Sequence, residues 1–219
     1  MTRRGLLLDV DGTLVDNSYF HSVAWFRACR DGGILVSMAR LHRLVGMGSD
    51  RYTAALLGEH RQDITEGHAR HIRPFFDEMV PLPGALELLR RSRDAGLRTV
   101  LASSAGASDL ERLIDILGAA ELIDEATSSG DAASKPAPDL VEVALARSGL
   151  RPEEAVFVGD TRWDVEAAGR AGVPCLGVLT GGWSEAELRE AGAVEVCESA
   201  AEVVARFDEL VVAATGAGR

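Results

Sequence analysis

The stretch that decides the fold is Leu6-Leu7-Leu8-Asp9-Val10-Asp11-Gly12-Thr13. Its three leucines predict a short buried strand, and the strand ends in an acid. In a parallel sheet the carboxyl ends of the strands face the ligand crevice, so we expect Asp9 and Asp11 to project there. Gly12 would let the backbone turn tightly and approach a bound ligand closely.

Two other interpretations of this stretch are open. A calcium-binding loop would need a bidentate acid at its twelfth position, which falls on Phe20, and the preceding run is strand-like. A plain turn at the end of a strand would also use Asp and Gly, because both residue types favour turns. The rest of the chain must decide between these readings.

Aliphatic segments of the same form recur along the chain, and amphipathic helical segments alternate with them. Each predicted helix is followed closely by a glycine, a common helix terminator. This alternation predicts an α/β fold, a Rossmann-like parallel sheet covered by helices on both faces. The further predicted strands are residues 98–102, 155–158 and 173–178, and the predicted helices are residues 84–95, 107–117, 138–148 and 165–171.

One segment departs from this alternation. Residues 17–79 show helical spacing of apolar residues and no convincing strand, over 19–29, 38–45, 51–57 and 64–76. The economical interpretation is an all-helical cap domain inserted after the first strand. We therefore expect residues 1–16 and 80–219 to form the α/β core and residues 17–79 the cap.

Composition excludes some classes of function. The 219 residues carry a formal net charge of −11 and only one lysine, Lys135, which argues against a nucleic-acid or anionic-membrane surface. Cys29, Cys175 and Cys197 show neither a metal spacing nor a disulfide pattern, as expected in the reducing cytoplasm. The apolar run near the N-terminus is too short for a signal peptide, and no apolar stretch is long enough to span a bilayer. We therefore expect a cytoplasmic protein.

Polar groups follow two further predicted segments. Ser103 and Ser104 end a strand just before a helix, where hydroxyls and free N–H groups can bind an anion, although a helix-capping serine would look the same. Lys135 lies in the loop Ser134-Lys135-Pro136-Ala137-Pro138, whose prolines would hold its ammonium group in one direction. A solvated surface lysine is the alternative.

Two more acids complete a candidate metal site. Asp160 ends another strand, and Asp164, four residues on, can face the same way on the first turn of a helix. Helix capping alone could also account for them. Together with Asp9 these carboxylates suit Mg²⁺, a hard ion that prefers oxygen ligands. The five histidines all fall in the helical insert, away from the predicted strand ends, so we expect no zinc site and treat them as surface or cap residues (His21, His42, His60, His68 and His71).

These four segments, in this order, resemble the motifs of the haloacid dehalogenase-like hydrolase superfamily. The resemblance spans nearly the whole chain, and the helical insert is similar to the small cap of the phosphoglycolate phosphatase and β-phosphoglucomutase-like subgroup. It implies that Asp9 is the nucleophile and Asp11 the acid/base, with the backbone carbonyl of Asp11 also offered to the metal. Asp160 would ligate Mg²⁺, and Asp164 would lie among or just behind the ligands.

The resemblance further implies that the transferring phosphoryl group is bound by Gly12, Ser103, Ser104 and Lys135. Relatives that remove halides lack an acid at the position of Asp11, so its presence favours phosphoryl transfer. The expected function is a Mg²⁺-dependent phosphatase that hydrolyses a small phosphorylated metabolite through an aspartyl-phosphate. We expect a monomer or homodimer, with no nucleic-acid or membrane partner.

Specificity is expected to come from the cap. Around the turn Gly46-Met47-Gly48, the nearest cations are Arg43 and Arg51, and we expect Arg43, Gly46 and Arg51 to meet the leaving group. Solvated charges on helix faces are the alternative for each arginine. Two other functions stay open. A sugar phosphomutase would be expected to carry a basic residue within this loop, and a non-catalytic binding module could retain the fold.

Overall fold

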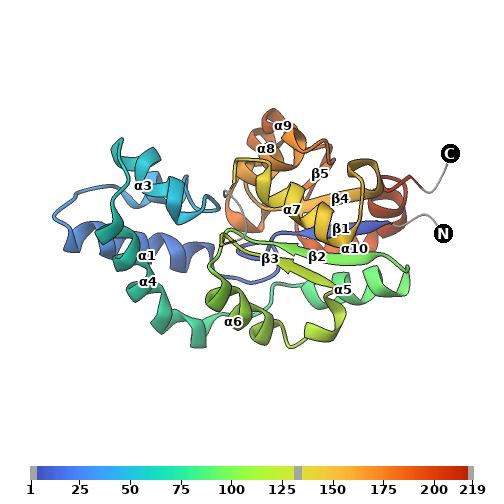
Figure 1. Ribbon diagram of the computed structural model, residues 1–219, viewed down its shortest axis with the longest axis horizontal. Helices are drawn as coiled ribbons and strands as arrows, with labels where there is room; N and C mark the ends of the chain where they lie inside the picture. The colour runs from blue at the N-terminus through green and yellow to red at the C-terminus, as the bar shows by residue number, and fades with distance from the viewer. Residues whose placement is uncertain (1–3, 131–134, 217–219) are drawn as a thin grey trace.

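A computed structural model describes residues 4–130 and 135–216 (Figure 1). Within these residues the strands form one six-stranded sheet in the order β3-β2-β1-β4-β5-β6, and every neighbouring pair is parallel. The predicted α/β fold with a parallel sheet is confirmed. The strands are β1 (Gly5–Leu8), β2 (Arg98–Ala102), β3 (Glu125–Thr127), β4 (Ala155–Gly159), β5 (Cys175–Val178) and β6 (Glu195–Cys197).

Helices cover both faces of this sheet, with α5, α6 and α10 on one face and α7, α8 and α9 on the other (Figure 1). Short helical turns connect several of these elements. The helices are α5 (Ala85–Asp94), α6 (Ala107–Leu117), α7 (Asp139–Ser148), α8 (Arg162–Arg170), α9 (Glu185–Ala191) and α10 (Ala200–Ala205). The short turns are η2 (Ala120–Leu122), η3 (Pro152–Glu154), η4 (Leu179–Gly181) and η5 (Asp208–Val212).

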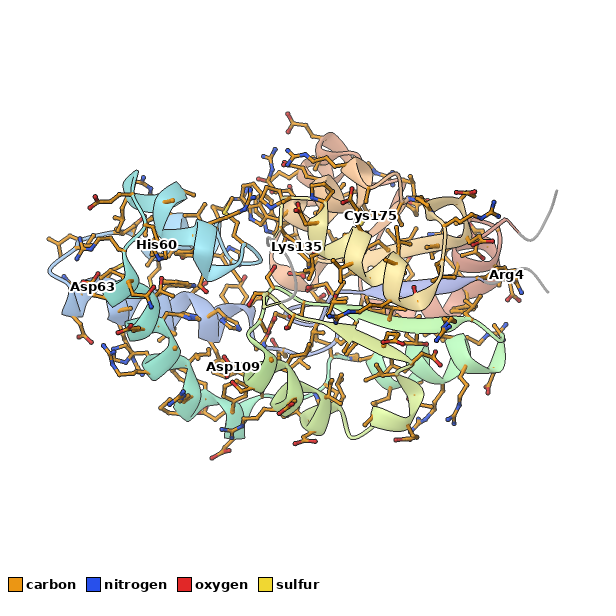
Figure 2. The ribbon with its side chains drawn as sticks, in the orientation of Figure 1. Arg4, His60, Asp63, Asp109, Lys135 and Cys175 are labelled. Atoms are coloured by element: carbon orange, nitrogen blue, oxygen red, sulfur yellow. The ribbon has the colours of Figure 1, made fainter. Side chains whose placement is uncertain are left out.

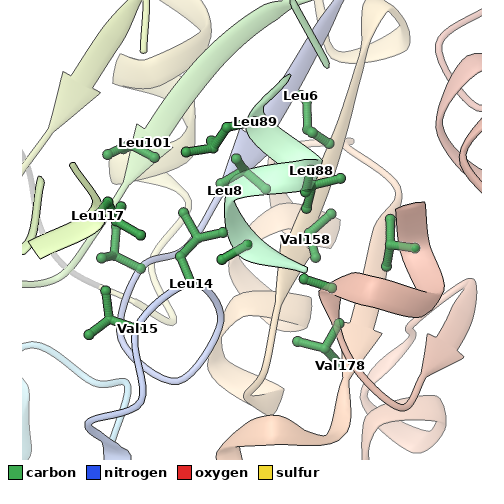
Figure 3. Packing of buried hydrophobic residues seen from close by; sticks show 14 of the residues in the cluster. Leu6, Leu8, Leu14, Val15, Leu88, Leu89, Leu101, Leu117, Val158 and Val178 are labelled. Carbon is green, nitrogen blue, oxygen red and sulfur yellow. The ribbon is translucent and has the colours of Figure 1, made fainter. Parts of the chain in front are cut away.

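The two hydrophobic layers follow from the alternation of side chains along the strands. Leu6 and Leu8 of β1 point into the layer that contains Leu88 of α5 (Figure 3), whereas Leu7 points into the opposite layer with Leu140 of α7. All three β1 leucines are fully buried. The central strand is therefore held from both sides, which fixes the position of the acid that follows it.

The helical insert consists of α1 (Ser18–Asp31), α2 (Met38–His42), α3 (Ser49–Leu57), α4 (Gln62–Ile72) and the 3₁₀ turn η1 (Arg73–Glu78). It has a hydrophobic cluster of its own, which includes Trp25, Leu41, Tyr52 and Ile64. The helix expected over residues 64–76 ends at Ile72 and continues as the tighter turn η1. Pro74 explains this change, because proline cannot donate the backbone hydrogen bond that an α-helix needs.

The two connections between insert and sheet run side by side. The backbone N–H of Asp16 donates to Val80 at 2.9 Å, and that of Leu82 donates to Leu14 at 2.8 Å. We propose that the cap begins at residue 17 and ends at residue 79, just beyond this paired crossing. None of the helices in the described ranges is both long enough and apolar enough to cross a membrane.

Candidate active site

Two acids meet at the point where the order of the strands reverses. β1 lies between β2 and β4, so Asp9, directly after β1, is next to Asp160, directly after β4. The hydroxyl of Thr13 links them, donating to Asp160 Oδ1 at 2.9 Å and lying 3.4 Å from Asp9 Oδ2. Ligands in open parallel sheets bind at such a reversal, outside the carboxyl ends of the strands.

Lys135 reaches the same point from the loop before α7. Its Nζ donates to Asp9 Oδ1 and lies 2.7 Å from Asp164 Oδ1, and its side chain is only 1% exposed. Burial alone would lower the pKa of Lys135, but the charges of Asp164 and Asp9 raise it, which keeps the ammonium group protonated. The solvated surface lysine is therefore excluded. The neighbouring Ser134 lies outside the described residues.

The other oxygen of Asp164 caps a helix. Its Oδ2 accepts hydrogen bonds from the backbone N–H of Thr161 at 3.0 Å and from the Thr161 hydroxyl at 2.5 Å, and Thr161 caps α8 in return. The two interpretations of Asp164, a cap and a member of the acid cluster, thus both describe its geometry. This capping box fixes the carboxylate that faces Lys135.

Asp9, Asp160 and Asp164 together could hold a metal ion, since one oxygen of each lies within 4.8 Å of the others. All three are buried, and Asp160 Oδ2 has no hydrogen-bond partner among the described residues. That oxygen lies against the backbone of Gly181, where a Cβ would come within 1.7 Å of it. A buried, unpartnered oxygen among hard carboxylate donors fits Mg²⁺.

Burial and the close packing of these carboxylates raise the pKa values of Asp9 and Asp160. Burial, reinforced by the charges of Asp164 and Asp11 and opposed by Lys135, raises the pKa of Asp9 to about 7. Burial and the charges of Asp164 and Asp9 raise the pKa of Asp160 well above its usual range. Each carboxylate would be ionised far more readily with a further cation beside it.

Asp11 is turned toward a different set of partners. Its Oδ1 accepts from Asn17 Nδ2 at 2.5 Å and lies 3.2 Å from His21 Nε2, and its Oδ2 accepts from the Ser103 hydroxyl at 3.2 Å. Burial would raise the pKa of Asp11, but the hydrogen bonds and charge from His21 and the hydrogen bond from Asn17 lower it. Asp9 and Asp11 thus differ in acidity because their surroundings differ.

His21 corrects the expectation that the histidines lie away from the strand ends. α1 begins directly after the turn that follows β1, so its first turn carries His21 back over that strand end. His21 Nδ1 lies 3.1 Å from His68 Nε2 of α4, and the His68 ring stacks on Trp25 with centroids 4.0 Å apart. Sequence reasoning also missed Asn17. The short spacing from β1 to the helix was the signal available for both.

The remaining predicted core residues lie around Asp9 and Asp11. Gly12 has a φ of 81°, a left-handed conformation that favours glycine, and a Cβ there would come within 2.5 Å of Asp160 Oδ2. Ser103 is buried and accepts a hydrogen bond from the N–H of Ala105 at 3.0 Å. The buried Ser104 Oγ has no hydrogen-bond partner among the described residues.

The predicted cap residues separate into different environments. Gly46 has a φ of 94°, and a Cβ there would come 2.7 Å from the Thr161 side chain, so this cap loop touches the core. Arg43 forms an ion pair with Glu187 of α9, and its guanidinium lies 4.0 Å from the centre of the Trp183 ring. Arg51 lies in α3.

A cavity of about 250 Å³ lies between insert and core. Asp9 and Asp11 line its floor, and its walls come from the insert and from the first turns of α6. Of the three predicted cap residues, Gly46 lines this cavity, whereas Arg43 and Arg51 are not among the described residues that do so. Buried acids of unequal acidity, a buried lysine and a cavity beside them form a site suited to nucleophilic catalysis.

Sequence comparison identifies the family. The sequence model of the haloacid dehalogenase-like hydrolases matches residues 4–172, well over half of the chain. The chain belongs to this hydrolase family. The match contains Asp9, Asp11, Ser103, Lys135 and Asp160, and it confirms the resemblance drawn from the motifs.

Individual relatives agree with this membership. The chain is 26% identical to validoxylamine A 7'-phosphate phosphatase of Streptomyces hygroscopicus subsp. limoneus, over 80% of this chain and 84% of that protein. It is also 26% identical to phosphoglycolate phosphatase of Escherichia coli K12, over 81% of this chain and 82% of that protein. The crystal structure of a hydrolase from Pseudomonas syringae superposes with a TM-score of 0.90 at 30% identity, covering 95% of this chain and 100% of that chain.

These comparisons bear on three predictions. The Rossmann-like core with an inserted helical cap is confirmed by the sheet and by the superposition on the Pseudomonas syringae hydrolase. The predicted subgroup is supported by the phosphoglycolate phosphatase relatives. Relatives named as phosphatases also support the predicted enzyme class, a phosphoric monoester hydrolase.

Proposed function

We propose that this hydrolase is a Mg²⁺-dependent phosphatase that cleaves small phosphate monoesters through an aspartyl-phosphate on Asp9. The observation that carries the proposal is a charge imbalance. Three buried carboxylates, Asp9, Asp160 and Asp164, share one buried cation, Lys135, so when all three are ionised, three negative charges against one positive charge leave an excess of two. One divalent cation would cancel this excess.

Asp9 attacks the phosphorus atom, and Lys135 holds the attacking carboxylate in place by its contact with Oδ1. When bound, Mg²⁺ supplies positive charge that reduces the repulsion between Asp9 and the phosphate dianion. Asp160 and Asp164 would hold the ion together with Asp9. The hydroxyls of Ser103 and Ser104 and the backbone at Gly12 bind the transferring phosphoryl group.

Asp11 handles the proton. It protonates the departing alkoxide and then takes a proton from the water that hydrolyses the aspartyl-phosphate. Its low pKa favours the ionised form, which is the form a base needs for the second step. For the first step Asp11 must acquire a proton, and the negative charge of a bound phosphate ester favours that uptake.

The cap excludes water and selects the ester. Its loop at Gly46 reaches the core at Thr161, and the His42 ring lies 2.9 Å from the carbonyl of Gly181. Such closure restricts entry to small esters that fit the cavity. Small phosphorylated metabolites, the substrates named for the phosphatase relatives, are consistent with this space.

We propose hydrolysis rather than the mutase alternative. A sugar phosphomutase must hold a second phosphate, and no Arg or Lys lines the cavity among the described residues. A non-catalytic module is disfavoured because the acids, the lysine and the serines of the motifs are all assembled at one site.

The test is hydrolysis of an aryl phosphate, such as p-nitrophenyl phosphate, with Mg²⁺ and with excess chelator. We expect turnover that requires Mg²⁺, is abolished by chelator and returns when Mg²⁺ is restored. Ca²⁺ should not replace Mg²⁺, because its larger and looser coordination shell misplaces the nucleophile. Full activity in chelator would end the Mg²⁺ proposal.

A further inference from the structure

Among the described residues, the part of the cavity that would receive the leaving group lacks the Arg or Lys side chains that would bind an anion. Its walls come from α1, α4 and α6, with His21, Trp25, His68 and Asp109 among the lining residues. No Arg or Lys lines it within residues 4–130 and 135–216, and the sequence of residues 131–134 contains none either. A carboxylate on the leaving group would therefore find no Arg or Lys in this lining, and among the described residues the basic side chains there are His21 and His68.

Two arginines, Arg73 and Arg112, lie close enough to Asp109 to oppose the rise in its pKa, but neither lines the cavity, and Arg112 pairs with Asp77 at 3.5 Å. Two further cations are engaged elsewhere. Lys135 is buried between Asp9 and Asp164, which together outweigh its charge. Arg43 binds Glu187 and stacks on Trp183, on the core side of the cap loop. Neither lines the wall opposite the attacking carboxylate.

The histidines do not supply the missing positive charge. Burial, together with the charge of His21, lowers the pKa of His68 well below its usual range, so this ring is neutral. His21 is in contact with Asp11, whose carboxylate offsets any charge that His21 carries. The pair presents no net cation to a ligand.

Asp109 brings negative charge to the same wall. It lies in the first turn of α6, and Figure 2 shows it at the border between the core and the helical insert. The free N–H groups of the helix N-terminus carry about half a positive charge, which a full carboxylate outweighs. Burial raises the pKa of Asp109, so the carboxylate would gain from a cationic partner.

The side-chain amide of Asn17 is a second polar group on this wall, and its oxygen can accept a hydrogen bond. Asn17 lines the cavity and is 1% exposed. Its Nδ2 donates to Asp11 at 2.5 Å, and its Oδ1 has no hydrogen-bond partner among the described residues. An amide oxygen can only accept, so it fits a hydroxyl or ammonium group and repels a carboxylate. A buried acceptor of this kind is costly unless a ligand or water satisfies it.

We propose that the substrate is the phosphate ester of an alcohol that carries no negative charge, with amino alcohols preferred, and that Asp109 recognises their ammonium group. This inference rests on the proposed phosphatase function. It separates this chain from enzymes whose substrate carries a carboxylate next to the ester, as phosphoglycolate does. Asp109 becomes the residue that determines the charge of the accepted leaving group.

The test uses three esters with the same two-carbon skeleton: ethanolamine phosphate, 2-hydroxyethyl phosphate and 2-phosphoglycolate. Their far ends are cationic, neutral and anionic. We expect kcat/KM of the wild-type enzyme to fall in that order, with the anionic ester about tenfold or more below the neutral one, because a like charge in a desolvated site is strongly disfavoured. p-Nitrophenyl phosphate serves as the reference for activity of the core.

Two variants of α6 assign the effect to Asp109. Asp109→Asn should reduce the ratio of kcat/KM between ethanolamine phosphate and 2-hydroxyethyl phosphate about tenfold, as expected for loss of a charge-assisted hydrogen bond. Asp115→Asn is the matched control, since Asp115 is an exposed acid of the same helix and does not line the cavity. It should leave the ratio unchanged.

The possible failures are distinguishable. If the aryl ester is hydrolysed but 2-phosphoglycolate is the best or an equal substrate of the three, the inference is overturned and the phosphatase proposal stands. If the wild-type order holds but Asp109→Asn keeps the full ratio, Asp109 is not the recognition residue. If no ester is hydrolysed with Mg²⁺, the proposed function is overturned, and the inference with it.

Discussion

The imidazole of His21, on the first helix of the insert, lies 3.2 Å from Oδ1 of Asp11 at the end of the central strand. This contact joins a cap residue to a core acid, and His68 supports the far side of the ring at 3.1 Å. The protonation and direction of Asp11 therefore depend on the position of the cap. An open cap that withdraws His21 would leave Asp11 with a higher pKa.

His21→Asn should lower kcat for alkyl phosphates about tenfold, because Asp11 loses a partner that orients it for proton transfer. Aryl phosphates, whose leaving groups need little protonation, should lose less. Steady-state kinetics on both ester types provides the measurement. His71→Asn is the control, since His71 pairs with Asp31 at 2.7 Å on the surface of the insert. Equal losses of kcat on alkyl and aryl phosphates would show that His21 only supports the structure and does not assist proton transfer.

Asp11→Asn should separate the two steps of the reaction. The amide cannot donate or accept the proton, so alkyl phosphates should lose about a hundredfold or more in the first step. Nitrophenyl esters should lose markedly less in that step, which a pre-steady-state burst of nitrophenol would reveal. Equal losses of the burst rate for both classes would show that Asp11 is not the general acid.

Mg²⁺ affinity should depend on pH through Asp9. The pKa of Asp9 in the metal-free protein is raised to about 7, so below that pH the ion must displace a proton, whereas above it the carboxylate is already ionised. The apparent Kd should rise about tenfold or more per pH unit below pH ~7, because Asp160, whose pKa is also raised, must lose its proton as well. Calorimetric titration from pH ~5.5 to ~8.5 checks this. A Kd that stays constant across the range would contradict the assignment of Asp9 as a ligand.

Arg43 should matter for closure of the cap rather than for recognition. Arg43→Ala removes the contacts with Glu187 and Trp183, and kcat/KM should fall by similar factors for aryl and alkyl esters. Both side chains of the ion pair are partly exposed, so a double-mutant cycle with Glu187→Gln should give a coupling of only about 0.5–1 kcal/mol. Glu190→Gln, on the same helix, is the control. A loss confined to one ester would instead place Arg43 on the leaving group.

The central part of the sheet could be predicted because its strands are continuous aliphatic runs. β1, β2 and β4 are almost entirely buried, and burial on both faces of a strand requires such runs. β3 and β6 were not predicted. Each has three residues, begins with a glutamate and lies at an edge of the sheet, where a strand needs little apolar surface. Their pairing partners, not their own sequences, make them strands.

The site residues that directly follow a predicted strand could be predicted from the sequence. Asp9 and Asp160 follow central strands, and the parallel topology brings them together without further information. The contact of Arg43 with Glu187 could not be foreseen, because it depends on how the cap loop meets α9 across the molecule. His21 could be predicted only in part. Its position shortly after the first strand and turn can be read from the sequence, but the direction in which α1 runs cannot.

The most direct test of the account is detection of the phosphoryl group on Asp9. Enzyme quenched in acid during turnover with Mg²⁺ should gain the mass of one phosphoryl group, located by mass spectrometry on the peptide that contains Asp9. Asp9→Asn should show neither the adduct nor turnover, whereas Asp16→Asn, an exposed acid of the same segment, should show both. A phosphoryl group found on another residue, or wild-type turnover by Asp9→Asn, would contradict the account.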